Sequence, residues 1–236
     1  MSSDRSRGGA QAQTRTSYTG ARPDVRSQVP GHARRILDVG CSNGALGQSL
    51  IVRHPGRSVT GIDSSADFCD EARRVLSRVI HADINSFDWD SQLRGERFDC
   101  IIFADVLEHL VEPWRVLQQA VEFLEPQGSI IISVPNIRHL SALSSIFLQG
   151  TFPRRPRGIF DRTHLRWFTI ADAQALARDA GLEIVALTSH LRVCDAPGGR
   201  LNEFVQRHFA LLARFSLIRE FLSYQLVIRA IRATHA

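Results

Sequence analysis

Lysine is missing from this 236-residue sequence, and all 29 of its basic side chains are arginines. The excess of arginines over acids is confined to one segment. Residues 1–35 hold seven arginines and two aspartates, whereas residues 36–236 hold 22 arginines and 22 acids. The net charge of +5 therefore belongs to the N-terminal segment. A domain without net charge lacks the general basic surface that binds phosphate backbones, which argues against a nucleic-acid partner.

Long apolar runs are missing as well. No run approaches the roughly 18 residues of a membrane span, and the N-terminus lacks the apolar core of a secretory signal. We therefore expect a cytoplasmic protein without a transmembrane segment. The four cysteines (Cys41, Cys69, Cys100 and Cys194) are scattered without the spacing of metal ligands, so we expect reduced thiols.

The first 30 residues are rich in Ser, Arg, Gly, Gln and Thr and carry almost no large apolar side chains. Such a segment cannot bury enough apolar surface to offset the entropy of ordering it. We predict that residues 1–30 form a disordered basic tail and that residues 31–236 form one domain. Peripheral contact of the tail with an anionic membrane is an alternative role.

Acids lie at the ends of four successive strand-like segments. Residues 36–39 include Asp38 and run into a glycine-bearing turn, and residues 58–63 end in Asp63. A short apolar segment precedes Asp83, and residues 100–104 run into Asp105. Parallel strands present their carboxyl ends along one edge of a sheet, where open α/β folds bind ligands. The spacing of about twenty residues between the turn and Asp63 is typical of a carboxylate that binds ribose hydroxyls.

Strand-like and helix-like segments alternate from residue 35 onward, which predicts an α/β fold with a doubly wound, mostly parallel, Rossmann-like sheet of seven strands. Residues 129–134 continue the series of buried strands. The strand candidates at residues 182–187 and 224–230 predict an antiparallel C-terminal strand at the end of the sheet. The loop-rich residues 135–168, with a helix candidate at 140–148, are predicted to form a cap or substrate loop.

At these residues the chain resembles the class I S-adenosylmethionine-dependent methyltransferases. The resemblance implies that the turn of residues 37–44 holds the methionine part of S-adenosylmethionine, with Asp38 near its amino group. It places Asp63 on the ribose, Asp83 beside the adenine amino group and Ile84 against the adenine ring. The implied cofactor-binding residues are Asp38, Gly40, Cys41, Gly44, Asp63, Asp83, Ile84, Ala104 and Asp105.

The turn departs from the usual glycine pattern because Ser42 stands at the middle glycine position. The same departure weakens the competing interpretation, an NAD-dependent oxidoreductase, whose pyrophosphate fingerprint needs that glycine and whose sheet is all parallel. A cofactor-binding scaffold without catalysis is the third alternative.

The Asp105–His109 segment, D-V-L-E-H, is the first candidate for catalysis. In the family, the residue after the fourth strand lies between cofactor and acceptor. A hydroxyl acceptor must lose its proton, and a histidine is a suitable base near neutral pH. We therefore predict His109 as the base. The pattern also resembles a metal site of the polyprenyl-phenol O-methyltransferases, in which Asp105, Glu108 and His109 would bind Mg²⁺. A purely structural role for Glu108 is the alternative.

A second dense cluster occupies residues 158–169, G-I-F-D-R-T-H-L-R-W-F-T. It resembles a bacterial branch of the family that acts on sugars of surface glycans and on secondary metabolites. Asp161 and His164 are further catalytic candidates, and the alternative is a salt-bridged loop. We expect methyl transfer to an oxygen of a small-molecule or glycan acceptor, with a polyprenyl phenol as the main alternative. The oligomeric state is left open.

Overall fold

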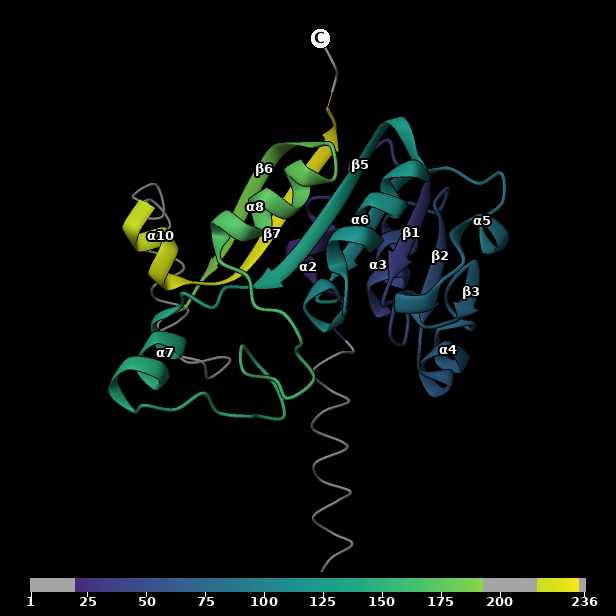
Figure 1. Ribbon diagram of the computed structural model, residues 1–236. Coiled ribbons are helices and arrows are strands. Elements are labelled where there is room, and N and C mark those ends of the chain that lie inside the picture. The colour runs from purple at the N-terminus through teal and green to yellow at the C-terminus, as the bar shows by residue number, and fades with distance from the viewer. Residues whose placement is uncertain (1–19, 193–215, 234–236) are drawn as a thin grey trace, which may run out of the picture.

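The computed structural model describes residues 20–192 and 216–233. Its centre is a seven-stranded sheet in the order β3-β2-β1-β4-β5-β7-β6, with helices on both faces (Figure 1). The strands are β1 Arg35–Val39, β2 Ser58–Asp63, β3 Arg78–His81, β4 Phe98–Ala104, β5 Leu124–Pro135, β6 Leu182–Leu191 and β7 Ser223–Arg232. The predicted α/β class and Rossmann-like sheet are confirmed.

The five strands from β1 to β5 run parallel. Ile36 of β1 pairs with Val59 of β2 on one side and with Cys100 of β4 on the other. Side chains on both faces of these strands are buried under helices, which explains why the strands are nearly continuous apolar runs. The C-terminal ends of these strands, and the acids that follow them, therefore lie along one edge.

Strand β7 runs antiparallel to both of its neighbours, β5 and β6. Ile132 of β5 pairs with Ile228 of β7, and Leu187 of β6 pairs with the same residue from the other side. The antiparallel C-terminal strand is therefore confirmed, although it lies inside the sheet and β6 forms the edge. This arrangement does not match the all-parallel sheet of a dinucleotide oxidoreductase.

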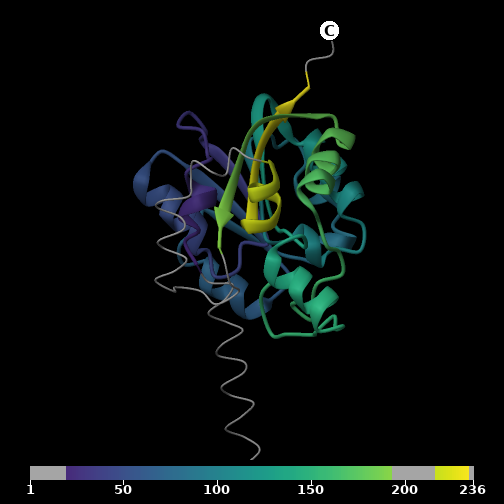
Figure 2. The ribbon, with the colours of Figure 1, turned by 90° about the vertical axis from the view of Figure 1, so that its left-hand side faces the viewer.

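Helices cover the two faces as separate layers (Figures 1 and 2). One layer contains α2 Pro23–Arg26, α3 Ala45–Arg53 and α4 Ala66–Ala72, and the other contains α6 Pro113–Glu122 and α8 Ile170–Asp179. Shorter turns are η1 Ile84–Ser86, α5 Trp89–Gln92 and η2 Leu107–His109. Thr169 caps α8 through a reciprocal bond with Asp172.

The predicted cap loop lies outside the two helical layers that cover the sheet. It contains α7 Leu140–Leu143 and the π-helical turn η3 Ser144–Leu148, and then an irregular stretch that reaches α8. In Figure 1 this segment lies below the sheet, on the side to which β5 points. A small separate core of Ala142, Ile159, Phe160 and Tyr224 holds it against the start of β7.

The N-terminal boundary requires a correction. Residues 1–19 lie outside the described part of the chain, but residues 20–30 pack against the domain. Val25 of α2 is fully buried in the cluster that includes Leu50 of α3, and Val29 is also buried. Arg57 donates to the carbonyl of Pro30 at 2.9 Å. Two valines are enough to anchor this short segment, so the prediction of disorder is wrong for residues 20–30. The amphipathic pattern of residues 204–221 predicts a helix, and α10 Ser216–Leu222 is its only part among the described residues.

Candidate active site

The turn after β1 has the backbone that close approach of a ligand requires. Gly40 and Gly44 have φ of 72° and 81°, which glycine adopts without strain. A Cβ on Gly40 would also lie 2.4 Å from Cγ2 of Val106. Ser42 adopts the same left-handed region, with φ of 50°. The missing middle glycine therefore leaves the shape of the turn intact.

Asp63, at the end of β2, is held in place by backbone amides. The N–H of Ser42 donates to its Oδ2 at 2.8 Å and the N–H of Ser65 donates to its Oδ1 at 2.9 Å. The side chain of Ser65, in turn, caps α4 by accepting from Phe68 N–H. These bonds fix the carboxylate at the edge of the sheet, beside the glycine turn.

Asp38 is 1% exposed, and its Oδ2 has no hydrogen-bond partner among the described residues. Burial, followed by the nearby negative charge of Asp63, raises the pKa of Asp38 to about 7. A buried carboxylate oxygen without a donor is costly unless a cation or a donor binds it. Asp38 therefore fits a site for a positively charged ligand group.

A cavity of about 590 Å³ opens between the turn and the ends of β2 and β4. It is lined by eight of the nine predicted cofactor-binding residues, namely Asp38, Gly40, Cys41, Asp63, Asp83, Ile84, Ala104 and Asp105. Gly44, the N-cap residue of α3, is the exception, although its neighbours Asn43 and Ala45 line the cavity. Asp83 accepts from the backbone N–H of Asn85 at 2.9 Å, which orients it at the start of η1.

Asp105 has an arrangement that the sequence did not reveal. It takes a left-handed backbone, with φ of 59°, at the end of β4. Its carboxylate accepts from the guanidinium of Arg22 and from the side-chain amide of Gln225, and Ser133 Oγ donates to it at 3.1 Å. Asp105 is therefore bound into a polar network that joins the N-terminal segment to β5 and β7.

This network corrects the proposed metal trio. Asp105 lies with Arg22, while Glu108 and His109 lie with His164. One ligand atom from each of Glu108, His109 and His164 falls within 4.8 Å of the others. Burial, and then the charge of Asp105, raises the pKa of Glu108. The trio of Asp105, Glu108 and His109 is therefore not assembled.

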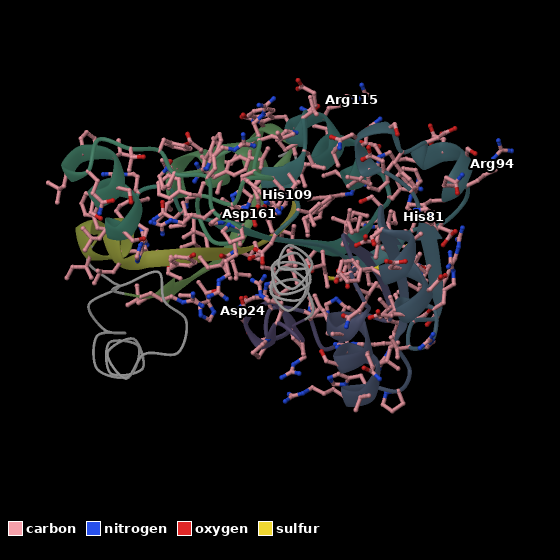
Figure 3. The ribbon with its side chains drawn as sticks, turned by 90° about the horizontal axis from the view of Figure 1, so that it is seen from below. Asp24, His81, Arg94, His109, Arg115 and Asp161 are labelled. Atoms are coloured by element: carbon pink, nitrogen blue, oxygen red, sulfur yellow. The ribbon has the colours of Figure 1, made fainter. Side chains whose placement is uncertain are left out.

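His109 lines the cavity and contacts the loop that carries Asp161. Thr163 Oγ1 donates to Asp161 Oδ1 at 2.7 Å and lies 3.1 Å from His109 Nδ1. The carbonyl oxygen of Thr163 lies 3.3 Å from the same nitrogen. Both oxygens accept from His109, so the proton of the neutral ring lies on Nδ1 and the lone pair on Nε2. Figure 3 shows His109 and Asp161 close together, seen from below.

His164 packs edge-on against His109, with ring centroids 4.7 Å apart. Its Nδ1 lies 3.0 Å from the carbonyl oxygen of Ile159, and its Nε2 lies 4.0 Å from Glu108 Oε1. Burial lowers the pKa of both histidines, and the neighbouring His109 lowers that of His164 further. Both rings are thus uncharged near neutral pH. His164 and Asp161 lie behind the cavity wall, and Thr163 of the same loop lines it.

Arg22 and Thr163 are two cavity-lining residues that the sequence did not single out. Arg22 lines the cavity from a segment that was predicted to be disordered, and no local pattern marks it. Thr163 lies between two residues of the predicted cluster, where its hydroxyl is a weak signal. These two residues add a cation and a hydroxyl to the predicted set of acids and histidines.

Comparison with known proteins agrees with this geometry. Residues 10–187 match a family described as a methyltransferase domain. The chain belongs to this family. The resemblance to class I S-adenosylmethionine-dependent methyltransferases is therefore confirmed, and with it the expected class of enzyme. The family match covers about three quarters of the chain and includes every cofactor-binding residue predicted above.

Individual relatives share only a modest part of the sequence. The chain is 31% identical over 154 residues to a ubiquinone biosynthesis O-methyltransferase of Hydrogenovibrio crunogenus, across 63% of this chain and 62% of that protein. A methyltransferase structure from Thermotoga maritima, described as a possible histamine N-methyltransferase, has a TM-score of 0.62 at 16% identity, covering 93% of this chain and 91% of that one. A plantazolicin methyltransferase in complex with SAH has a TM-score of 0.59 at 17% identity, over 98% of this chain and 92% of that one. The structural likenesses show the fold alone.

Proposed function

We propose that this methyltransferase transfers the methyl group of S-adenosylmethionine to a hydroxyl oxygen of a small molecule, with His109 as the base. The observation that carries the proposal is the bonding of His109. Two oxygens of Thr163 accept from its Nδ1, which places the basic lone pair of the neutral ring on Nε2. Burial lowers its pKa, so the ring is unprotonated near pH 7 and can accept a proton.

The cavity suits the cofactor that the family implies. Asp38, whose Oδ2 has no donor among the described residues, would bind the ammonium group. The fixed carboxylate of Asp63 would accept from the ribose hydroxyls, and Asp83 with Ile84 would bind the adenine. When bound, the cofactor supplies an electrophilic methyl group. The protein then has to align the acceptor and remove its proton.

For the acceptor, a polyprenyl phenol or a related quinone precursor is better supported than a glycan sugar. The relative from Hydrogenovibrio crunogenus is named for ubiquinone biosynthesis. In addition, apolar side chains such as Phe147 and Leu148 are exposed on the cap loop. A phenol is acidic enough for a histidine to deprotonate, whereas a sugar hydroxyl is a much weaker acid. Mg²⁺ is not needed in this proposal.

The direct experiment is a transfer assay with methyl-labelled S-adenosylmethionine and a panel of prenylated catechols, simple phenols, sugars and amines. The expected product is an aryl methyl ether, identified by mass spectrometry and NMR. Methylation of nitrogen or carbon, or of sugars in preference to phenols, would contradict the proposal. Addition of a chelator tests the metal: retained turnover supports His109 as base, whereas loss of turnover that Mg²⁺ restores would assign the histidines to a metal site.

A further inference from the structure

The charge of the domain is unevenly distributed. Residues 36–236 hold 22 arginines and 22 acids, but residues 137–167 hold six of these arginines and a single acid, Asp161. The rest of the domain therefore carries 16 arginines and 21 acids. Asp161 is only 5% exposed and lies inside the loop. Residues 137–167, the cap-loop face, therefore carry a net positive charge, even though Arg138 is paired with Glu220 of α10, while the remainder of the domain is net negative.

The same face exposes large apolar side chains. Among the described residues, ten large hydrophobic side chains are exposed, and six of them belong to residues 137–167. Phe147 and Leu148 are the most exposed of all, at 77% and 84%. Scattered exposed apolar residues are ordinary, but a concentration of them marks an interaction surface.

The apolar side chains are held by packing beneath them. Phe152 lies edge-on to Phe160 and Trp167, with ring centroids 4.8 and 5.0 Å away. Phe160 belongs to the small core of the cap loop, together with Ala142 and Ile159. Figures 1 and 2 both show α7 and the following loop projecting below the sheet. The aromatic side chains of the face are therefore held in place by rings packed beneath them.

We infer that the cap-loop face docks on an anionic lipid bilayer. A bilayer surface accepts both features at once, because aromatic and aliphatic side chains enter the boundary of the acyl chains while arginines stay at anionic headgroups. A second copy of the chain fits less well, because a symmetric contact would bring two positive faces together. A nucleic acid would leave exposed aliphatic side chains such as Leu148 without a partner.

Docking would also orient the active site. Thr163 belongs to the cap-loop face and lines the cavity beside His109. The docked enzyme would therefore hold its cavity close to the membrane surface, where a lipid-soluble acceptor is concentrated. Docking itself goes beyond the proposed function, and the binding experiment below needs no turnover, so either can fail without the other.

The test is co-flotation of the full chain with vesicles of pure phosphatidylcholine or of phosphatidylcholine with about 30% phosphatidylglycerol. Binding is expected only to the anionic vesicles, and it should weaken as salt is raised. Leu148→Asp should lower the partition coefficient by about tenfold or more, since it removes an inserted side chain and adds a negative charge. Val52→Asp is the matched control, because Val52 is 72% exposed on α3, outside the face.

The arginines are tested separately. Arg154→Gln with Arg157→Gln should weaken binding by roughly 25-fold, on the order of fivefold per arginine at an anionic surface. The control pair is Arg94→Gln with Arg115→Gln, two exposed arginines outside the face (Figure 3). The N-terminal arginines are the same in every variant. Failure to bind anionic vesicles, equal effects of test and control pairs, or a dimer in sedimentation that Leu148→Asp abolishes would each overturn the inference.

Discussion

The guanidinium of Arg22 donates to the carboxylate of Asp105, which lies 83 positions further along the chain. Arg22 also bonds Asp24 and Ser133, so one side chain joins the N-terminal segment to the ends of β4 and β5. Burial opposes the charge of Arg22, but the two aspartates raise its pKa, and the guanidinium stays charged. The N-terminal segment is therefore part of the cavity wall.

The first prediction concerns this segment. A chain that begins at Gly20 should keep its melting temperature and its cofactor affinity. A chain that begins at Gly31 should lose about 3–5 kcal/mol of unfolding free energy, because the buried Val25 and Val29 are removed. Thermal denaturation and calorimetric titration of both chains measure the difference. Equal melting temperatures would show that residues 20–30 contribute nothing to stability.

The second prediction concerns Asp63. Asp63→Ala should weaken the binding of S-adenosylmethionine by roughly 2–3 kcal/mol, because charge-assisted bonds to the ligand and the clamps from Ser42 and Ser65 are lost together. Calorimetry with S-adenosylhomocysteine measures the change. Asp67→Ala is the matched control, since Asp67 is exposed on α4 four residues later. An unchanged dissociation constant in Asp63→Ala would remove Asp63 from the site.

The third prediction concerns pH. The folded-state pKa of Asp38 is raised to about 7, so Asp38 is largely protonated below that pH. Binding of a cationic amino group then requires loss of the proton, and the dissociation constant should fall by about fivefold between pH 6 and pH 7. Asp38→Asn should bind more weakly at pH 7 and show little of this dependence. A wild-type dissociation constant that stays flat over the same range would contradict the assignment.

The fourth prediction concerns the histidines. His109→Ala should lower kcat by about 10²–10⁴-fold and leave cofactor affinity nearly intact. His164→Ala should mainly raise KM, because His164 supports the loop and lies behind the cavity wall. His54→Ala, an exposed histidine after α3, is the control. Full turnover in both active-site variants would show that the acceptor needs no protein base, and would favour nitrogen or carbon as the methyl acceptor.

The fifth prediction tests whether Asp161 acts on His109 or has only a structural role. The negative charge of Asp161 raises the pKa of His109 against the effect of burial. Asp161→Asn removes that charge, so the pKa of His109 should fall further. Because the protonated ring is inactive, the acidic limb of the kcat/KM profile should move to lower pH. A lower maximum with an unmoved limb would indicate that Asp161 only holds the loop.

Sequence patterns were sufficient for the parallel strands and for the acids after them, because both signals are local. A strand buried on both faces has a continuous apolar sequence, and the residue after it lies at the carboxyl-terminal edge of a parallel sheet. The network around Asp105 could not be found this way. Its partners Arg22 and Gln225 lie 83 and 120 positions away, and neither stands in a pattern. The anchoring of residues 20–30 was missed because two valines hardly change the amino-acid composition of a segment rich in polar residues.

The place of β7 between β5 and β6 has a consequence for how the protein folds. Of the seven strands β7 is synthesised last, yet it supplies the hydrogen-bond partners of both neighbours. Until β7 has left the ribosome, β6 has no strand to pair with, and β5 leaves an edge of unpaired amides and carbonyls. Pairing over so many residues of chain is slow. During synthesis the protein therefore passes through a stage in which the unpaired edge of β5 is exposed to other chains and to chaperones.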